Sequence, residues 1–219
     1  MNIPTLAENH RLVILDLDGT LYDKKGLSRR MVLHAPWDMM KMLAERKTRA
    51  EMKGEWQGEG FAAQYYQRMA QRMHCSEKKA QAWYEQCYMP LMVKMIGKYQ
   101  PVNDWVMPFL EECRSRSVKM VVLSDYTHAK EKLEALGIDA QVFDWVGSSS
   151  ELGGLKPAPQ IMHIVAERMG VTPQECLVIG DREDTDGEMA RKAGAEFCLV
   201  TDILAERGSG GAIGMEFVR

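Results

Sequence analysis

The chain has 219 residues, of which 46% are hydrophobic, and it carries a formal net charge of -3 at pH 7. This length suits one sizeable domain or one domain with an insertion. The slightly acidic balance argues against a nucleic-acid binder that works through bulk charge, and the apolar runs all fall short of the roughly 20 residues that cross a membrane.

The first predicted strand is the apolar run Leu12–Leu15, which is followed by the string DLDGT at Asp16–Thr20. Side chains alternate along a strand, so Asp16 and Asp18 point into one small space if the strand geometry continues. Two carboxylates held together repel each other unless a cation bridges them or one of them carries a proton. An EF-hand calcium loop is excluded, because its twelfth position is Leu27 where a glutamate is needed. A strand followed by a turn with two solvated aspartates is the simpler alternative.

Residues 21 to 103 show helical periodicity in place of strand patterns. The pattern predicts helices over about residues 28–53, 60–73 and 76–97, and Ser76 can cap the last of them. Because this block is too long for a crossover between strands, it predicts a helical insertion; an extended helical layer of the same domain is the alternative. Four basic residues near its start either meet an anionic substrate or simply begin an exposed helix: Lys24, Lys25, Arg29 and Arg30.

The second predicted strand covers residues 118–123 and ends in Ser124 and Asp125. A serine at this point can donate a hydrogen bond to a bound oxyanion, as can the backbone amides that follow it. The alternative role for Ser124 is to cap the helix predicted over residues 129–136, and the two roles are compatible.

A third predicted strand covers residues 142–146, and the sequence GGLKPAP follows it at residues 153–159. Pro157 and Pro159 restrict the shape of this loop, which contains Lys156. A lysine in a stiff loop at the carboxyl end of a strand can neutralise phosphate charge at a small entropic cost. An ordinary exposed lysine is the alternative.

The fourth predicted strand, residues 176–179, is followed by GDREDTD at residues 180–186, and a weaker fifth strand is expected at residues 197–200. The several carboxylates of this motif are unfavourable unless they are solvated or paired. Magnesium would offset that cost, since it prefers a few carboxylate oxygens together with water and phosphate oxygens. A solvated acidic helix N-terminus is the alternative.

The apolar runs alternate with amphipathic helices, which are expected over residues 129–136, 160–169 and 187–193. That alternation indicates an α/β fold with a Rossmann-like parallel sheet covered by helices on both faces. In such sheets ligands bind beyond the carboxyl ends of the strands, where all the polar motifs lie. The glycine-rich segment at residues 208–214 is expected to be a loop.

Taken together and in this order, DLDGT, Ser124, GGLKP and GDREDTD resemble the motifs of the haloacid dehalogenase-like (HAD) superfamily. The likeness is to its phosphatase branch, the phosphoglycolate phosphatase and beta-phosphoglucomutase-like group, which has a helical cap inserted between the first and second motifs. It implies a HAD-like α/β core domain formed by residues 1–20 and 104–219, and a helical cap domain formed by residues 21–103.

The resemblance implies a role for each acidic residue of the motifs. Asp16 is implied as the nucleophile that forms an aspartyl-phosphate, and Asp18 as the general acid and base that carries the proton. Asp16, the backbone carbonyl of Asp18, and Asp181 are implied as ligands of Mg²⁺, with Asp186 as a supporting carboxylate. Asp184 competes for the supporting role, but Asp186 is preferred because the helix that follows it is in the expected register.

The resemblance also implies that Ser124, Asp125 and Lys156 form the substrate phosphate site, and that Lys156 neutralises the charge of Asp16. Asp125 departs from the family pattern, since asparagine is usual at that place. The carboxylate of Asp18 favours phosphate chemistry, because the dehalogenases of the superfamily lack a carboxylate there.

The leading prediction is a magnesium-dependent phosphatase that hydrolyses a small phosphorylated metabolite, with the cap setting the choice of substrate. A sugar-phosphate mutase is the second hypothesis; it uses the same residues and needs a cap histidine or lysine, for which His34 is a candidate. The third is a non-catalytic regulatory or binding domain on this fold.

We expect no nucleic-acid or membrane partner and a monomer or homodimer. The odd number of cysteines and the first ten residues, which do not resemble a signal peptide, predict a cytoplasmic location.

Overall fold

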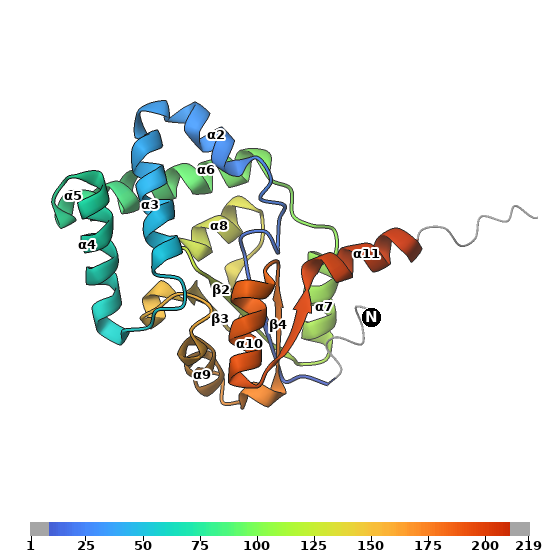
Figure 1. The fold of residues 1–219 in the computed structure, drawn as a ribbon. Coiled ribbons are helices and arrows are strands. Elements are labelled where there is room, and N and C mark those ends of the chain that lie inside the picture. Colours follow the sequence, from blue (N-terminus) through green and yellow to red (C-terminus); the bar gives the residue numbers. More distant parts are fainter. Residues whose placement is uncertain (1–8, 211–219) are drawn as a thin grey trace, which may run out of the picture.

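Five parallel strands form the centre of the structure, a computed structural model that describes residues 9–210 of the chain (Figure 1). Their spatial order is β3-β2-β1-β4-β5, and their bounds are β1 (Leu12–Leu15), β2 (Lys119–Ser124), β3 (Trp145–Ser148), β4 (Cys176–Gly180) and β5 (Glu196–Leu199). β1 lies in the middle, since Leu12 is paired with Lys119 of β2 and with Cys176 of β4. The parallel sheet and its helices confirm the predicted fold class.

The two faces of the sheet are covered by different helices, because side chains alternate along each strand. Val13 and Leu15 of β1 belong to one apolar cluster, and Leu12 and Ile14 belong to another. The first cluster includes α7 (Val106–Ser115), α8 (Ala129–Ala135) and α11 (Val200–Gly210), and the second includes α9 (Pro159–Arg168) and α10 (Glu188–Ala193). Burial on both faces explains why β1 is apolar at every position.

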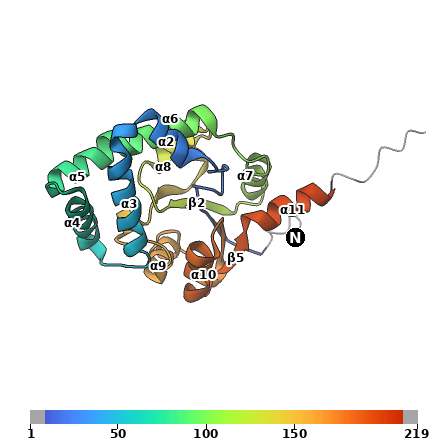
Figure 2. The same ribbon diagram turned by 45° about the horizontal axis from the view of Figure 1, so that its top comes forward.

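The chain between β1 and β2 is helical, and its helices lie together to one side of the sheet (Figures 1 and 2). They are α2 (Leu27–His34), α3 (Met39–Glu51), α4 (Phe61–Met73), α5 (Glu77–Trp83) and α6 (Met89–Tyr99). Ser76 caps α5 as expected, because its hydroxyl accepts a hydrogen bond from the backbone N–H of Lys79 at 3.4 Å. The single helix expected over residues 28–53 is wrong. Ala35 leaves the helical conformation, with φ -140° and ψ 65°, because it precedes Pro36.

Two sets of backbone contacts join these helices to the sheet region. At the first, residues 21–22 pair with residues 102–103, where the chain leaves the sheet and returns to it. At the second, residues 55–57 pair with residues 153–155 through backbone hydrogen bonds of 2.8 and 3.0 Å. Gly153 permits this approach, because its φ is 91° and a Cβ there would lie 2.5 Å from the neighbouring backbone. The loop that contains the predicted lysine motif is therefore attached to the helical block.

The first of these contacts offers a natural division of the chain, and we propose residues 21–103 as a cap domain and residues 1–20 and 104–219 as a core domain. α11 continues through Gly210, so residues 208–210, expected to lie in a loop, are helical. The rest of that segment, residues 211–214, lies outside the described residues. None of the helices within residues 9–210 is long and apolar enough to span a bilayer.

Candidate active site

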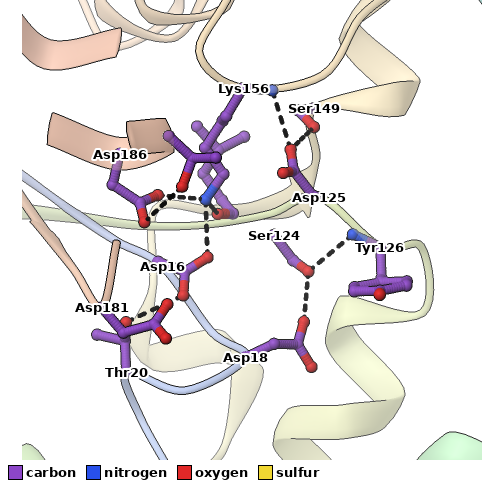
Figure 3. A network of polar contacts seen from close by, with 12 residues as sticks. Asp16, Asp18, Thr20, Ser124, Asp125, Tyr126, Ser149, Lys156, Asp181 and Asp186 are labelled. Carbon is purple, nitrogen blue, oxygen red and sulfur yellow. Dashed lines mark hydrogen bonds and ion pairs between the residues drawn. The ribbon is translucent and has the colours of Figure 1, made fainter. Parts of the chain in front are cut away.

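The polar motifs meet at the carboxyl ends of the strands (Figure 3). Asp16 follows β1, Ser124 ends β2 and Asp181 follows β4, and these three strands are neighbours in the sheet. The loop after β3 brings Lys156 to the same place (Figure 3). The alignment extends beyond the strands, since the backbone N–H of Asp16 donates to the carbonyl oxygen of Ile179 at 2.9 Å. Sheet topology therefore assembles residues that lie far apart in the sequence.

Lys156 is the centre of this network. It is only 3% exposed, and its Nζ donates to Asp16 Oδ1 at 2.7 Å, to Asp186 Oδ1 at 2.6 Å and to the carbonyl oxygen of Leu123 at 3.0 Å. The hydroxyl of Thr20 donates to the other oxygen of Asp16 at 2.9 Å. Burial raises the pKa of Asp16 to about 7, although the positive charge of Lys156 opposes this change. Asp16 is thus held at both oxygens in a site that still favours additional positive charge.

Three carboxylates form a cluster that can hold a cation, because oxygen atoms of Asp16, Asp181 and Asp186 lie within 4.8 Å of one another. Lys24 contacts this cluster, with its Nζ 2.5 Å from Asp181 Oδ2 and 3.1 Å from the backbone carbonyl oxygen of Asp18. A positive charge is therefore attracted to a place surrounded by carboxylate and carbonyl oxygens. Oxygen donors of this kind are the ligands that Mg²⁺ prefers, so the donor set fits a divalent cation.

Two glycines allow the carboxylates to come close to the backbone. A Cβ on Gly19, where φ is 108°, would lie 2.5 Å from Asp181 Oδ2, and a Cβ on Gly180 would lie 2.5 Å from the side chain of Asp186. Any larger residue at either position would displace a carboxylate of the cluster. The glycines of DLDGT and GDREDTD therefore serve the site as well as the turns.

Asp18 accepts hydrogen bonds from three side chains. Lys132 Nζ, from α8, lies 2.8 and 2.7 Å from its two oxygens, the hydroxyl of Tyr22 donates at 2.6 Å, and the hydroxyl of Ser124 donates at 2.7 Å. Burial raises the pKa of Asp18. The charge and hydrogen bonds of Lys132, together with the hydrogen bonds from Tyr22 and Ser124, outweigh this effect, so the pKa lies below its ordinary value. The arrangement favours an ionised Asp18, which differs from the proton-carrying role expected from the sequence.

Ser124 and Asp125 both make contacts that order the site. The hydroxyl of Ser124 donates to the carboxylate of Asp18 and also accepts a hydrogen bond from the backbone N–H of Tyr126 at 3.0 Å. Asp125 Oδ1 accepts from the hydroxyl of Ser149 at 2.5 Å and from the backbone N–H of Lys156 at 3.1 Å (Figure 3). Asp125 is therefore a support of the loop that carries the lysine.

Asp184 and Asp186 point to different places, because residues two apart do not share a face of the helical turn Glu183–Gly187. Asp186 is 2% exposed and belongs to the acidic cluster. Asp184 is exposed and forms ion pairs with Arg182, at 2.6 Å, and with Lys53. The structure thus brings Asp186, rather than Asp184, to the other carboxylates.

Three polar residues of the site were not expected from the sequence: Thr20, Tyr22 and Lys132. A signal was present for Lys132, because it lies on the same helical face as the buried residues Ala129 and Leu133. A lysine in that position predicts a buried ammonium with an acidic partner. Thr20 and Tyr22 carried no such signal, since their contacts depend on how the chain folds back after the DLDGT turn.

A cavity of about 450 Å³, which we call the cationic cavity, lies over Lys156 between α3 and the loops that follow β2 and β4. Its basic lining residues are Arg46, Arg49, Lys53, Lys156 and Arg182. Arg49 crosses from α3 to the sheet side, where its guanidinium donates to the carbonyl oxygen of Asp125 at 2.7 Å. Positive charge above a buried carboxylate cluster suits an anionic ligand.

Comparison with known proteins identifies the family. The model of the haloacid dehalogenase-like hydrolases matches residues 10–194, so this chain belongs to that family. Glyceraldehyde 3-phosphate phosphatase of Methanopyrus kandleri is 38% identical over 97 residues, which cover 43% of this chain and only 41% of that enzyme. N-acylneuraminate-9-phosphatase of Homo sapiens is 29% identical over 203 residues, or 84% of this chain and 79% of that enzyme. The solved structure of beta-phosphoglucomutase from Clostridium difficile has a TM-score of 0.62 at 20% identity, and covers 86% of this chain and 83% of that one.

The family match confirms the prediction made from the motifs that the chain is a HAD-like hydrolase. Both curated relatives are phosphatases by name, and the chain spans less than half the length of the Methanopyrus kandleri enzyme. The mutase structure, at 20% identity, supports the fold alone.

Replacing Lys132 by methionine is expected to lower the free energy of unfolding by about 3–5 kcal/mol at pH 8, because the buried carboxylate of Asp18 loses its cation. Adding Asp18→Asn should recover most of this loss, since a neutral amide needs no counter-charge. Urea unfolding of both single variants and the double variant measures the coupling. Lys130→Met, which removes an exposed lysine of the same helix, is the control and should change stability by less than about 0.5 kcal/mol. An equal loss for Lys132→Met with and without Asp18→Asn would contradict the pairing.

Proposed function

We propose that this protein is a magnesium-dependent phosphatase that hydrolyses a small phosphorylated metabolite through an aspartyl-phosphate on Asp16. The observation that carries the proposal is the setting of Asp16, a buried carboxylate held by Lys156 and Thr20 beneath the cationic cavity. Phosphoryl transfer depends mainly on positioning and charge neutralisation, and this arrangement supplies both. The phosphatases named among the relatives support the same reaction class.

We further propose that Asp16, Asp181 and the backbone carbonyl of Asp18 hold Mg²⁺, with Asp186 in support. The proximity of their oxygen atoms and the position of the Lys24 ammonium support this assignment. When bound, the ion supplies positive charge to the phosphoryl oxygens. Lys24 must leave the cluster when the ion binds, and its side chain, 44% exposed, has solvent to enter.

In the proposed reaction a carboxylate oxygen of Asp16 attacks phosphorus, and the bond from phosphorus to the ester oxygen breaks. The leaving alcohol takes a proton, and water then hydrolyses the aspartyl-phosphate to regenerate the carboxylate and release phosphate. Lys156 balances the charge of Asp16 and fixes its direction of attack. Asp125 serves by holding the Lys156 loop, because a carboxylate beside a phosphate would repel it.

Asp18 and Ser124 take part through a change of side-chain position. For Asp18 to deliver a proton to the leaving oxygen, it must turn away from Lys132 and acquire the proton, since the contacts that lower its pKa favour the ionised form. The hydroxyl of Ser124 donates to Asp18 at 2.7 Å. When the Asp18 side chain rotates away, this hydroxyl is free to bind a phosphoryl oxygen. Lys132 thus sets the resting position of the proposed acid.

Magnesium at 100 times its Kd is expected to stabilise the protein by about 2.7 kcal/mol. Asp181→Asn should remove most of this effect, because it deletes a proposed direct ligand. Asp184→Asn is the matched control, since this aspartate lies in the same motif but outside the acidic cluster, and it should retain the full effect. Urea unfolding with and without magnesium chloride measures the difference. An undiminished magnesium effect in Asp181→Asn would remove this residue from the ligand set.

A screen of phosphorylated metabolites with and without magnesium tests the function, provided that both inorganic phosphate and the organic product are measured. A phosphatase releases one phosphate for each dephosphorylated product; a mutase yields an isomerised sugar phosphate with no net release. His34, the candidate for the mutase reaction, lies against the ring of Tyr99 with Nδ1 2.9 Å from the carbonyl oxygen of Arg30, outside the lining of the cationic cavity. Failure of magnesium to increase phosphate release from any compound would refute the proposal.

A further inference from the structure

A second cavity, of about 400 Å³, lies between α2, the first turns of α3 and the loop after β2. Its walls are mainly apolar and include Met31, Met39, Met42, Leu43 and Tyr88, so we call it the apolar cavity. Its polar and charged lining residues are Ser28, Arg29 and Arg46. Its volume falls in the range of small-molecule sites, about 300–1,000 Å³.

The apolar cavity adjoins the cationic cavity, because Arg46 and Tyr126 line both of them. Lys156, whose Nζ lies 2.7 Å from Asp16, lines the cationic cavity. A ligand that places a phosphate near Lys156 can therefore extend past Tyr126 into the apolar cavity. The guanidinium of Arg49 lies 3.9 Å from the centre of the Tyr126 ring, which fixes this boundary.

Several side chains of the apolar cavity are unusually exposed for their type: Leu33 is 68% exposed, Met39 43% and Leu43 42%. Exposed apolar side chains gathered around a hollow are typical of an interaction site. Trp37 and Met40 are also exposed in this part of the cap, at 77% and 69%, but they do not line the cavity. Substitutions of exposed apolar residues inside and outside the cavity can therefore be compared for their effect on ligand binding.

More basic residues line the cationic cavity than the apolar cavity, which has Arg29 in addition to the shared Arg46. Arg49, Lys53 and Arg182 of the cationic cavity all have acidic partners. Arg46, at the junction, has no ion pair with any side chain described in residues 9–205, so its charge is available to an anion. An anionic group thus suits one side of Arg46 and an apolar group suits the other.

We propose that the substrate is an amphiphilic phosphomonoester. Its phosphate lies in the cationic cavity, and its leaving group has an alkyl or arylalkyl body that lies in the apolar cavity. This inference rests on the proposed phosphatase function and adds the class of substrate. Covering Met39 and Leu43 removes apolar surface from water on both molecules, which favours binding of such an ester over a hydroxylated one.

Two phosphonates, which hydrolysis cannot cleave, test the inference by binding in the presence of magnesium. Isothermal titration calorimetry should show that isopentylphosphonate binds at least about tenfold more tightly than dihydroxypropylphosphonate. Leu43→Glu should abolish this preference, and Leu43→Ala, which is milder for α3, should weaken it. Met40→Glu places the same charge on an exposed residue of the same helix outside the cavity, and it should keep the preference. Equal binding of both phosphonates by the wild type, or equal loss in both glutamate variants, would overturn the inference.

Turnover separates this inference from the proposed function. Isopentyl phosphate and glycerol phosphate both release an alcohol, and kcat/KM should favour the isopentyl ester by about tenfold or more. If the phosphonates bind as expected but neither ester releases phosphate, the phosphatase proposal fails and the ligand class stands. If both esters are hydrolysed with equal kcat/KM and both phosphonates bind equally, the ligand class fails and the phosphatase proposal stands.

Discussion

Replacing Asp16 by asparagine is expected to lower magnesium-dependent phosphate release by about 10³-fold or more, because the amide cannot form the aspartyl-phosphate. The amide oxygen of the new residue can still accept the hydrogen bond from Lys156. The amide NH2 takes the place of the other oxygen and can donate to the hydroxyl of Thr20, which accepts as well as donates, so the fold should persist. Phosphate release from a generic aryl phosphate measures the effect. Circular dichroism and urea unfolding establish that the variant is folded.

The covalent step has its own measurement. Acid quenching of the wild type during turnover of a radiolabelled substrate should leave phosphate bound to the protein, and hydroxylamine should release it. Asp16→Asn should carry no such label, whereas Asp202→Asn, which alters an exposed aspartate of α11, should behave as the wild type. Turnover of Asp16→Asn at the wild-type rate would exclude Asp16 as the nucleophile.

Replacing Lys156 by methionine is expected to lower the free energy of unfolding by about 3–5 kcal/mol at pH 8, because the buried Asp16 and Asp186 lose their shared cation. Phosphate release should fall as well, since Asp16 loses the group that directs it. Lys78→Met, at an exposed lysine of α5, is the control and should change stability by less than about 0.5 kcal/mol.

The loss caused by Lys156→Met should depend on pH. Burial already raises the pKa of Asp16 and of Asp186 in the folded protein, and removal of the lysine raises both further. A carboxyl group whose pKa is higher in the folded state than the unfolded value of about 3.9 destabilises the fold progressively as the pH rises between the two values. Urea unfolding without metal should therefore show a smaller loss at pH 5 than at pH 8. An equal loss at both values would show that packing, rather than charge, is the role of Lys156.

The strands are predictable from the sequence where both faces of the sheet are buried. Leu12–Leu15 is buried at every position, so the apolar run and the strand end together. The third strand, expected at residues 142–146, instead covers Trp145–Ser148, because residues 140–142 form a turn that Asp139 caps. Its last residues, glycine and serine, are buried without being strongly apolar, and hydrophobicity alone does not reveal them.

The helix α7 was not predicted from the sequence, because Pro108 lies in its first turn. Proline is tolerated there, although within a sequence it usually indicates the end of a helix. Some contacts of the site follow from the positions of residues relative to the strands, and others depend on how distant segments pack. Asp16, Asp181 and the motif lysine each follow a strand, so their meeting at one edge of the sheet follows from topology. The pairing of Asp18 with Lys132 spans 114 residues and depends on how α8 packs, which a local motif does not encode.

The pairing of residues 55–57 with residues 153–155 has a mechanical consequence. A cap joined to its core only where the chain crosses between them can rotate as a rigid lid, but here a second edge of the helical block is bonded to the loop that carries Lys156. Any displacement of residues 55–57 relative to the sheet must either break those backbone hydrogen bonds or move the loop that holds Lys156 against Asp16. The position of the helical block and the position of the ammonium beside Asp16 are therefore mechanically linked.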